Sequence, residues 1–221
     1  MTRGTVLSQL ADIIVSLQRS HPLRIAIDGI DASGKTTLAD QLMPVIEQRG
    51  RSVIRASIDG FHRPRSERYQ RGPVSLAGYY EDSFDYPSLQ SALLHPLGPN
   101  GNRRYRHAIF DVRNDIPLVT TEEQAPPDAI LLFDGVFLLR PELNTLWDYR
   151  IFVHVDFEVA LQRAMVRDQT LFGTPEAVHA RYLQRYIPGQ RLYFQLAHPQ
   201  KLADVIVENN DPAHPSLVFH K

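Results

Sequence analysis

The sequence contains no cysteine, so disulfide bonds, thiolate catalysis and cysteine-ligated zinc are all excluded. It also lacks an apolar run long enough to cross a membrane, and its N-terminus lacks the apolar core of a signal peptide. The formal net charge is only −1 over 221 residues, which gives no overall attraction to nucleic acids or anionic membranes. We therefore expect a cytoplasmic protein that binds neither nucleic acid nor membrane. A homo-oligomer remains open.

Lysine is nearly absent, because only Lys35, Lys201 and Lys221 occur among the 24 basic residues. Lys35 lies in residues 29–36, GIDASGKT, which fit the pattern G-x-x-x-x-G-K-[ST]. The residues before this segment read as a short buried strand, and those after it begin a helical pattern. Strand, glycine loop and helix form the context that a phosphate-binding loop requires. The composition disfavours the alternative, an ordinary glycine-containing turn before a helix.

The chemistry of this loop follows from its residue types. Gly29 and Gly34 let the backbone curl so that successive N–H groups point at a phosphate, and the helix N-terminus adds positive charge. Lys35 can reach the outer phosphates of ATP, and the Thr36 hydroxyl can bind Mg²⁺. The predicted nucleotide-binding residues are Gly29, Ile30, Asp31, Ala32, Ser33, Gly34, Lys35, Thr36 and Thr37.

Strands and helices alternate along the chain, which predicts an α/β fold with a mostly parallel sheet covered on both faces. The expected strands are residues 24–28, 52–58, 129–133, 149–155 and 203–207. The expected helices are residues 5–19, 35–49, 87–97, 141–147, 157–172 and 174–186. Between them, residues 60–87 read as a long functional loop or insertion, and residues 103–120 as a β-hairpin or ribbon.

Acidic residues follow three of the predicted strands: Asp28, Asp59 and Asp134, each directly before a glycine. In a parallel sheet the carboxyl ends of the strands meet at one edge, where ligands bind, so we expect these residues near the phosphate loop. Asp59 could bind Mg²⁺ or accept the proton of an attacking hydroxyl, and Asp134 could join the metal shell. The alternative for both is a simple Asp-Gly turn.

Arginines recur in the region after the fourth predicted strand. Arg163 and Arg167 are four residues apart, so they share one face of a helix and could close over a transferring phosphoryl group. A solvated helix face is the equally weighted alternative. The basic and aromatic segments 61–71 and 103–107 could indicate RNA binding, but their tyrosines do not interleave regularly with arginines and the net charge argues against it.

With these residues in place, the chain resembles the uridine kinase-like group of P-loop kinases, which also includes pantothenate kinase and phosphoribulokinase. The resemblance covers about residues 24–209. It rests on GIDASGKTT at 29–37, IDGFHRPR at 58–65, YYEDSFDYP at 79–87, LLFDGVFLL at 131–139, RAMVRD at 163–168 and ADVIVENND at 203–211. It implies a three-layer P-loop NTPase fold in a single domain, 1–221, with an acceptor-binding insert over about 60–120 and an arginine-containing helical lid over about 157–186.

The resemblance also implies roles for individual residues. The Asp59 position serves as base and metal partner, and the Asp85 position holds the ribose hydroxyls of a nucleoside. The Asp134 position joins the metal shell, and the positions of Arg163 and Arg167 lie in the lid. This sequence departs from uridine kinases in having His62 in place of Tyr and Asp134 in place of Glu. The pyrimidine-recognising segment also matches poorly, and its candidates are Tyr105, His107, Phe110 and Asp111.

The sequence therefore predicts a kinase that transfers the γ-phosphoryl group of ATP to a primary hydroxyl, with a nucleoside such as uridine or cytidine as the expected acceptor. A kinase of another alcohol, such as pantothenate or a sugar, and a regulatory ATPase remain open. The predicted catalytic residues are Asp59, Lys35, Arg163 and Arg167. The predicted acceptor-binding residues are Asp59, His62, Asp85, Tyr105 and Phe110, and the predicted Mg²⁺ ligands are Thr36, Asp59 and Asp134.

Overall fold

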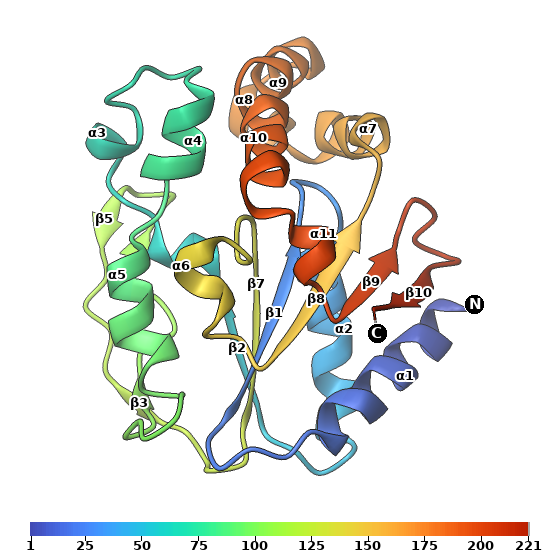
Figure 1. The fold of residues 1–221 in the computed structure, drawn as a ribbon. Coiled ribbons are helices and arrows are strands. Elements are labelled where there is room, and N and C mark those ends of the chain that lie inside the picture. The colour runs from blue at the N-terminus through green and yellow to red at the C-terminus, as the bar shows by residue number, and fades with distance from the viewer. Residues whose placement is uncertain (221) are drawn as a thin grey trace.

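A six-stranded sheet lies at the centre of the computed structural model, which describes residues 1–220 (Figure 1). Its strand order is β10-β9-β8-β1-β7-β2. The strands are β1 (Leu23–Gly29), β2 (Val53–Ser57), β7 (Ile130–Gly135), β8 (Tyr149–His154), β9 (Val205–Glu208) and β10 (Ser216–Phe219). All neighbouring pairs are parallel except β9 and β10. The register pairs Asp28 with Gly135 and Ser57 with Asp134, so the carboxyl ends of β1, β7 and β2 lie at the same edge of the sheet.

Alternate residues of the central strands point into two separate apolar layers. Ile25 and Ile27 pack on one side with α1 (Arg3–Ser16) and α2 (Lys35–Glu47), whereas Ala26 and Phe133 pack on the other. That second layer includes residues of α5 (Tyr86–Leu89), α6 (Pro141–Asn144) and α10 (Ile187–Ala197). Strands buried on both faces are expected for a parallel sheet. The predicted three-layer α/β fold is confirmed.

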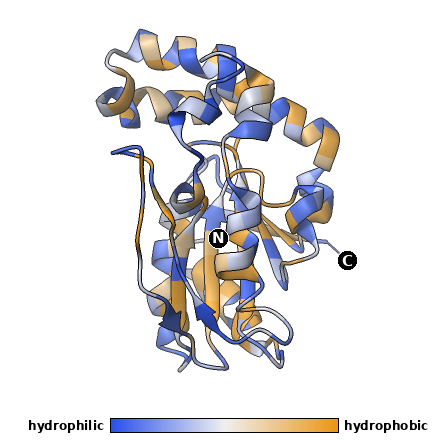
Figure 2. Ribbon diagram, turned by 90° about the vertical axis from the view of Figure 1, so that its left-hand side faces the viewer, coloured by the Kyte–Doolittle hydropathy of each residue, from blue (hydrophilic) through white to orange (hydrophobic). Residues whose placement is uncertain are grey.

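The carboxyl ends of the strands are covered by helices from two parts of the chain (Figure 1). One group is α3 (Arg65–Arg68) and α4 (Leu76–Asp82), which fall in the predicted insertion. The other group is α7 (Phe157–Arg167), α8 (Gln169–Phe172), α9 (Pro175–Arg181), a π-helical turn (Tyr182–Tyr186) and α10. Figure 2 shows apolar residues concentrated in the sheet, whereas these upper helices mix polar and apolar residues. Within residues 1–220, no helix combines the length and apolar character needed to cross a bilayer.

Several elements differ from the sequence prediction. The helix predicted at 157–172, for example, is divided into α7 and α8. Residues 103–120 do not form one ribbon, because Arg104–Tyr105 pairs with Glu123–Gln124 and Phe110–Asp111 pairs separately with Ile116–Pro117. The helix predicted at 174–186 continues through a π-helical turn into α10, and that turn accommodates Pro188, which lacks a backbone donor. The antiparallel edge strand β10 was not predicted, since its four residues carry no strong pattern.

Candidate active site

The phosphate loop is held so tightly that two of its residues must be glycine. A Cβ on Gly29 would lie 2.5 Å from the Val153 carbonyl oxygen, and one on Gly34 would lie 2.8 Å from Nδ2 of Asn209. Both residues also have positive φ, 153° and 95°, which side chains other than glycine rarely adopt. The loop therefore packs closely between Val153 of β8 and Asn209, the residue that follows β9, at the carboxyl ends of the strands.

The interior of the loop carries donors suited to an anion. Lys35 is 8% exposed, and its Nζ donates to the Ile30 carbonyl oxygen at 2.7 Å. The Ser33 hydroxyl is buried and has no hydrogen-bond partner among residues 1–220. Burial lowers the pKa of Lys35, and the carboxylates of Asp31 and Asp28 oppose that shift. An unpartnered hydroxyl, a buried ammonium group and the first turn of α2 fit the oxygens of a phosphate chain.

On one flank of the loop, Thr36 and Asp134 are in direct contact. The Thr36 hydroxyl donates to Oδ2 of Asp134 at 2.6 Å, and Arg55 Nη2 donates to Oδ1 at 3.0 Å. Arg55 also pairs with Asp40 on α2 at 2.9 Å, which fixes the guanidinium group. Sequence analysis missed Arg55, although a charged residue in the middle of an otherwise uncharged predicted strand, 52–58, was a usable signal. No cluster of three or more His, Asp or Glu side chains within the described residues could hold a metal alone, so a divalent ion here needs phosphate oxygens as well.

Asp59 lies in the single 3-10 turn (Ile58–Phe61) that follows β2. Its carboxylate is 71% exposed and accepts no hydrogen bond from the part of the chain that the structure describes. His62 lies beside it, with Nδ1 at 3.9 Å from Oδ1 and hydrogen-bonded to the Asp59 carbonyl oxygen at 3.1 Å. Burial against Phe84 lowers the pKa of His62, with ring centroids 4.5 Å apart. The structure thus leaves the Asp59 carboxylate free beside a neutral ring.

Two of the predicted acceptor-binding residues lie next to this turn, and one does not. The Asp85 backbone N–H donates to the Phe61 carbonyl at 2.8 Å, and the Asp85 carboxylate caps α5 through Ser88. The residue before Phe110, Ile109, donates to the Gly60 carbonyl at 2.8 Å.

Tyr105, by contrast, is buried in the core, and its hydroxyl donates to Glu123 at 3.1 Å within the ladder of β3 (Arg104–Tyr105) and β6 (Glu123–Gln124). That ladder lies at the opposite end of the sheet from the phosphate loop (Figure 1). The Arg106 backbone holds it there by donating to the Ala92 carbonyl oxygen at 2.9 Å. The structure therefore does not bring Tyr105 to the site, and we omit it from the proposal below.

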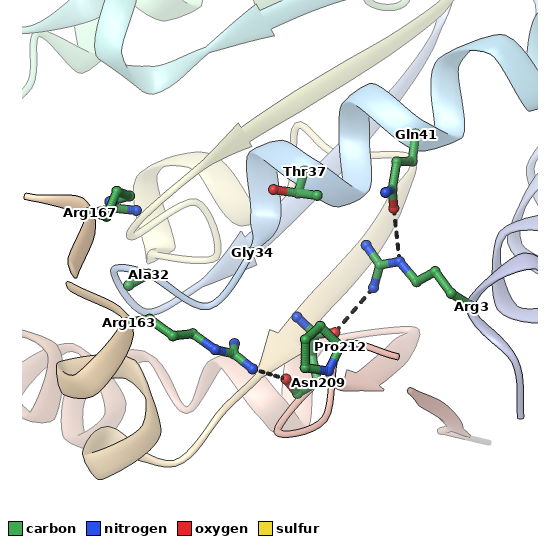
Figure 3. Close-up of a pocket in the computed structure, with 9 residues that line it drawn as sticks. All are labelled: Arg3, Ala32, Gly34, Thr37, Gln41, Arg163, Arg167, Asn209 and Pro212. Carbon is green, nitrogen blue, oxygen red and sulfur yellow. Dashed lines mark hydrogen bonds between the residues drawn. The ribbon is translucent and has the colours of Figure 1, made fainter. Parts of the chain in front are cut away.

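Arg163 and Arg167 both line a cavity of about 310 Å³ beside the loop (Figure 3). They share a helix face, as their spacing predicts, but each is engaged within the chain. Arg163 donates to the carbonyl oxygens of Asn209 and Asn210 at 2.8 and 3.0 Å. Arg167 pairs with Asp168 at 2.6 Å. Arg163 keeps Nε and Nη1 free of hydrogen bonds within residues 1–220, and Arg167 keeps Nη1 free.

Asp31, the third residue of the loop, joins it to both groups of upper helices. Its Oδ2 accepts hydrogen bonds from Tyr79 on α4 at 2.6 Å and from Gln190 on α10 at 2.5 Å. Burial raises the pKa of Asp31, and the nearby Lys35 charge opposes that shift. Sequence analysis did not predict these partners, which lie 48 and 159 residues away.

Comparisons with known proteins agree with this architecture. No model of a protein family matches the chain. It is 30% identical over 189 residues to a uridine kinase of Leuconostoc citreum, covering 84% of this chain and 87% of that protein. The chain belongs to the uridine kinase family. It is also 28% identical over 189 residues to uridine-cytidine kinase B of Dictyostelium discoideum, covering 85% and 74% of the two chains. The solved structure of a possible uridine kinase from Bacillus stearothermophilus superposes with a TM-score of 0.72 at 23% identity, covering 90% and 96%.

Membership of the uridine kinase family confirms the predicted class of reaction. The protein is an ATP-dependent phosphotransferase that acts on a hydroxyl group, and the regulatory ATPase alternative is not favoured. ATP is accompanied by a divalent metal ion in this chemistry. The family assignment rests on most of the chain rather than on the phosphate loop alone, which many unrelated families share.

One buried acid of this uridine kinase family member holds the strand that leads into the loop. Asp28 is fully buried and accepts hydrogen bonds from the Tyr193 hydroxyl and from the Gly29 backbone at 2.8 Å. The Tyr193 oxygen in turn accepts from the Leu139 backbone at 2.9 Å. Burial raises the pKa of Asp28 to about 6, although these hydrogen bonds and Lys35 oppose the shift. Tyr193 thus satisfies two buried groups at the base of the site.

We expect Tyr193→Phe to lower the free energy of unfolding by about 1–3 kcal/mol, because two buried groups lose their partner. A carboxyl whose folded pKa lies above its unfolded value stabilises the fold below the unfolded pKa, and that stabilisation is lost as the pH rises through the folded pKa. Because the pKa of Asp28 in the folded protein is about 6, the carboxylate is mostly charged at pH 8. A buried charged carboxylate loses more than a neutral carboxyl when the Tyr193 donor is removed. Urea unfolding should therefore show a larger loss at pH 8 than at pH 5.

Tyr80→Phe is the matched control, because Tyr80 packs in the same apolar layer and its hydroxyl has no hydrogen bond within residues 1–220. A Tyr193→Phe loss that matches the Tyr80→Phe loss at both pH values would contradict the assigned role of the hydroxyl.

Proposed function

We propose that this uridine kinase family member transfers the γ-phosphoryl group of ATP to the primary hydroxyl of a pyrimidine nucleoside, with Mg²⁺ as the divalent ion. The observation that carries the proposal is the free carboxylate of Asp59 in the turn after β2. β2 is the neighbour of β7, which carries Asp134, and β7 is the neighbour of β1, which leads into the phosphate loop. The choice of a pyrimidine nucleoside as acceptor is supported by the names of the relatives, which are a uridine kinase and a uridine-cytidine kinase.

In this proposal each residue acts through a contact that its position allows. Lys35 and the backbone of residues 29–37 hold the phosphates of ATP. Thr36 and Asp134 hold Mg²⁺ together with phosphate oxygens, and Asp59 completes that shell or accepts the proton of the acceptor hydroxyl. Mg²⁺ neutralises charge that develops on the phosphates. His62, Asp85 and Phe110 surround the acceptor, and the Asp85 carboxylate can accept ribose hydroxyls because each of its oxygens bonds Ser88 only once.

Positioning and electrostatics dominate the rate gain in such a transfer, because the transition state is loose and its charge is spread over the phosphoryl oxygens. Arg163 and Arg167, which line the cavity beside the loop, neutralise part of that charge. The insert and the α7–α9 region act as acceptor site and lid. Asp59 orients the hydroxyl for in-line attack, and its proton removal is a smaller contribution.

An acceptor panel tests the proposal. Purified protein with ATP and Mg²⁺ is assayed for ADP with uridine, cytidine, pantothenate and fructose, and with no acceptor as the control. We expect ADP and a nucleoside monophosphate with uridine or cytidine only. Turnover with pantothenate or fructose alone would overturn the acceptor assignment but preserve the kinase. Equal ADP formation with no acceptor would instead indicate an ATPase.

A further inference from the structure

The N-terminal helix α1 reaches the phosphate loop through its first residue. α1 packs along α2, and its N-cap is Thr2, whose hydroxyl accepts from the Thr5 backbone. Arg3, at the start of the helix, lines the same 310 Å³ cavity as Gly34 and Arg163 (Figure 3). A residue before the first strand therefore faces the site that the loop builds, although no sequence motif includes it.

Arg3 spans the mouth of this cavity by two hydrogen bonds. Its Nε donates to Oε1 of Gln41 at 2.9 Å, and its Nη1 donates to Oδ1 of Asn209 at 3.1 Å. Asn209 is 2% exposed, and its amide donates to the Ser33 carbonyl oxygen at 2.7 Å. Arg3 thus holds the side chain that supports the loop, and Figure 3 shows this bridge from α1 to both partners.

The charge of Arg3 is not compensated by the protein. Both of its partners are neutral amide oxygens, and within residues 1–220 it forms no ion pair with a carboxylate. Its Nη2 forms no hydrogen bond in the described residues, so two N–H donors remain available at the cavity. A half-buried guanidinium with free donors is suited to a polar ligand that the cavity would hold.

The cavity lies on the flank of the loop away from the metal side. Thr36 faces Asp134, whereas the next residue, Thr37, lines the cavity, and consecutive helix residues project about 100° apart. The γ-phosphate belongs near Thr36, Asp134 and Asp59, so the other end of the nucleotide extends toward Thr37 and Gln41. About 310 Å³ falls at the lower end of the volumes typical of small-molecule sites.

We propose that Arg3 binds the donor nucleotide at its ribose and base end, which makes the N-terminal helix part of the nucleotide site. The free Nη2 donors bind hydroxyl or ring acceptor atoms of the nucleoside part, while the Asn209 contact keeps the loop in place. This inference rests on the donor half of the proposed function and is independent of the acceptor.

The test compares Arg3→Gln with Arg49→Gln. Arg49 also joins α1 to the end of α2, through Asp12 at 2.7 Å and the Ser8 hydroxyl at 2.8 Å, but it does not line the cavity. The Kd values for ATP and for inorganic tripolyphosphate are measured with Mg²⁺ and without any acceptor. We expect Arg3→Gln to raise the Kd for ATP about tenfold and to leave that for tripolyphosphate within about twofold. Arg49→Gln should change neither Kd.

Two results would overturn the inference. One is an Arg3→Gln protein that binds ATP as tightly as Arg49→Gln does. Arg3 would then only attach α1 to Gln41 and Asn209 and would not bind the nucleotide. The other is an equal loss of ATP and tripolyphosphate binding, which would place Arg3 at the phosphates or at the loop itself. If Arg3→Gln does not fold, Arg3→Lys replaces it, since lysine keeps the charge but loses the paired donors. Because no acceptor is present, a wrong acceptor assignment cannot change any of these outcomes.

Discussion

Asp59→Asn is expected to lower kcat by about 10²–10⁴-fold while the Kd for ATP stays within a few-fold of the unsubstituted protein. The change removes the charge of an exposed carboxylate that makes no hydrogen bond within residues 1–220, so the fold loses nothing. What it removes is the group proposed to orient the acceptor hydroxyl and to complete the metal shell. Steady-state kinetics with uridine and a direct ATP-binding titration separate these two effects.

Asp128→Asn provides the control, because Asp128 is 63% exposed and precedes β7, at the other end of the sheet. It should keep the original kcat and the original Kd for ATP. If the kcat of Asp59→Asn is near that of the unsubstituted protein, Asp59 is not a catalytic residue. The role proposed for its carboxylate would then have to be assigned to Asp31 or Asp134.

Lys35→Met is expected to lower kcat/KM by about 10³-fold and to weaken ATP binding as well. Lys35 is buried, and its ammonium group lies where it neutralises Asp28, Asp31 and Asp134 as well as bound phosphate. Methionine keeps most of the volume and removes the charge. A fluorescent ATP analogue measures the affinity, and initial rates with uridine give kcat/KM.

Lys201→Met on α11 (Pro199–Leu202) removes an exposed lysine far along the chain from the loop and should behave like the unsubstituted protein. Unfolding curves of both variants exclude a loss of fold as the cause. ATP binding by folded Lys35→Met at the original affinity would show that the Lys35 ammonium group does not contribute to holding the phosphates.

The parts of this protein that the sequence predicts well are those set by local pattern. The glycine loop between a buried strand and a helix needs only adjacent residues. Asp28 and Asp134 lie near the ends of strongly apolar strands, and Asp59 lies in the turn directly after β2. Parallel pairing then brings those ends together without further information. The i, i+4 spacing of Arg163 and Arg167 likewise predicts that they share one helix face, and in the structure both line one cavity.

The contacts that sequence analysis missed join residues far apart in the chain. Gln190 lies 159 residues from Asp31, and Arg3 lies 206 residues from Asn209. No periodicity within one element encodes such pairs, because the sheet topology decides which elements meet. Tyr105 differs in the opposite way. The sequence predicts it at the acceptor site, whereas the two-residue ladder with Glu123–Gln124 lies at the far end of the sheet from the phosphate loop (Figure 1).

The shared carboxylate oxygen of Asp31 has a mechanical consequence. The tyrosine that bonds it comes from the segment proposed to hold the alcohol, and the glutamine comes from the helix that continues out of the arginine-bearing region. Neither segment can move apart from the other without breaking its hydrogen bond to Asp31 of the phosphate loop. A substrate that orders either segment therefore also orders the phosphate loop. We expect bound ATP to raise the affinity for the acceptor, and bound acceptor to raise the affinity for ATP by the same factor.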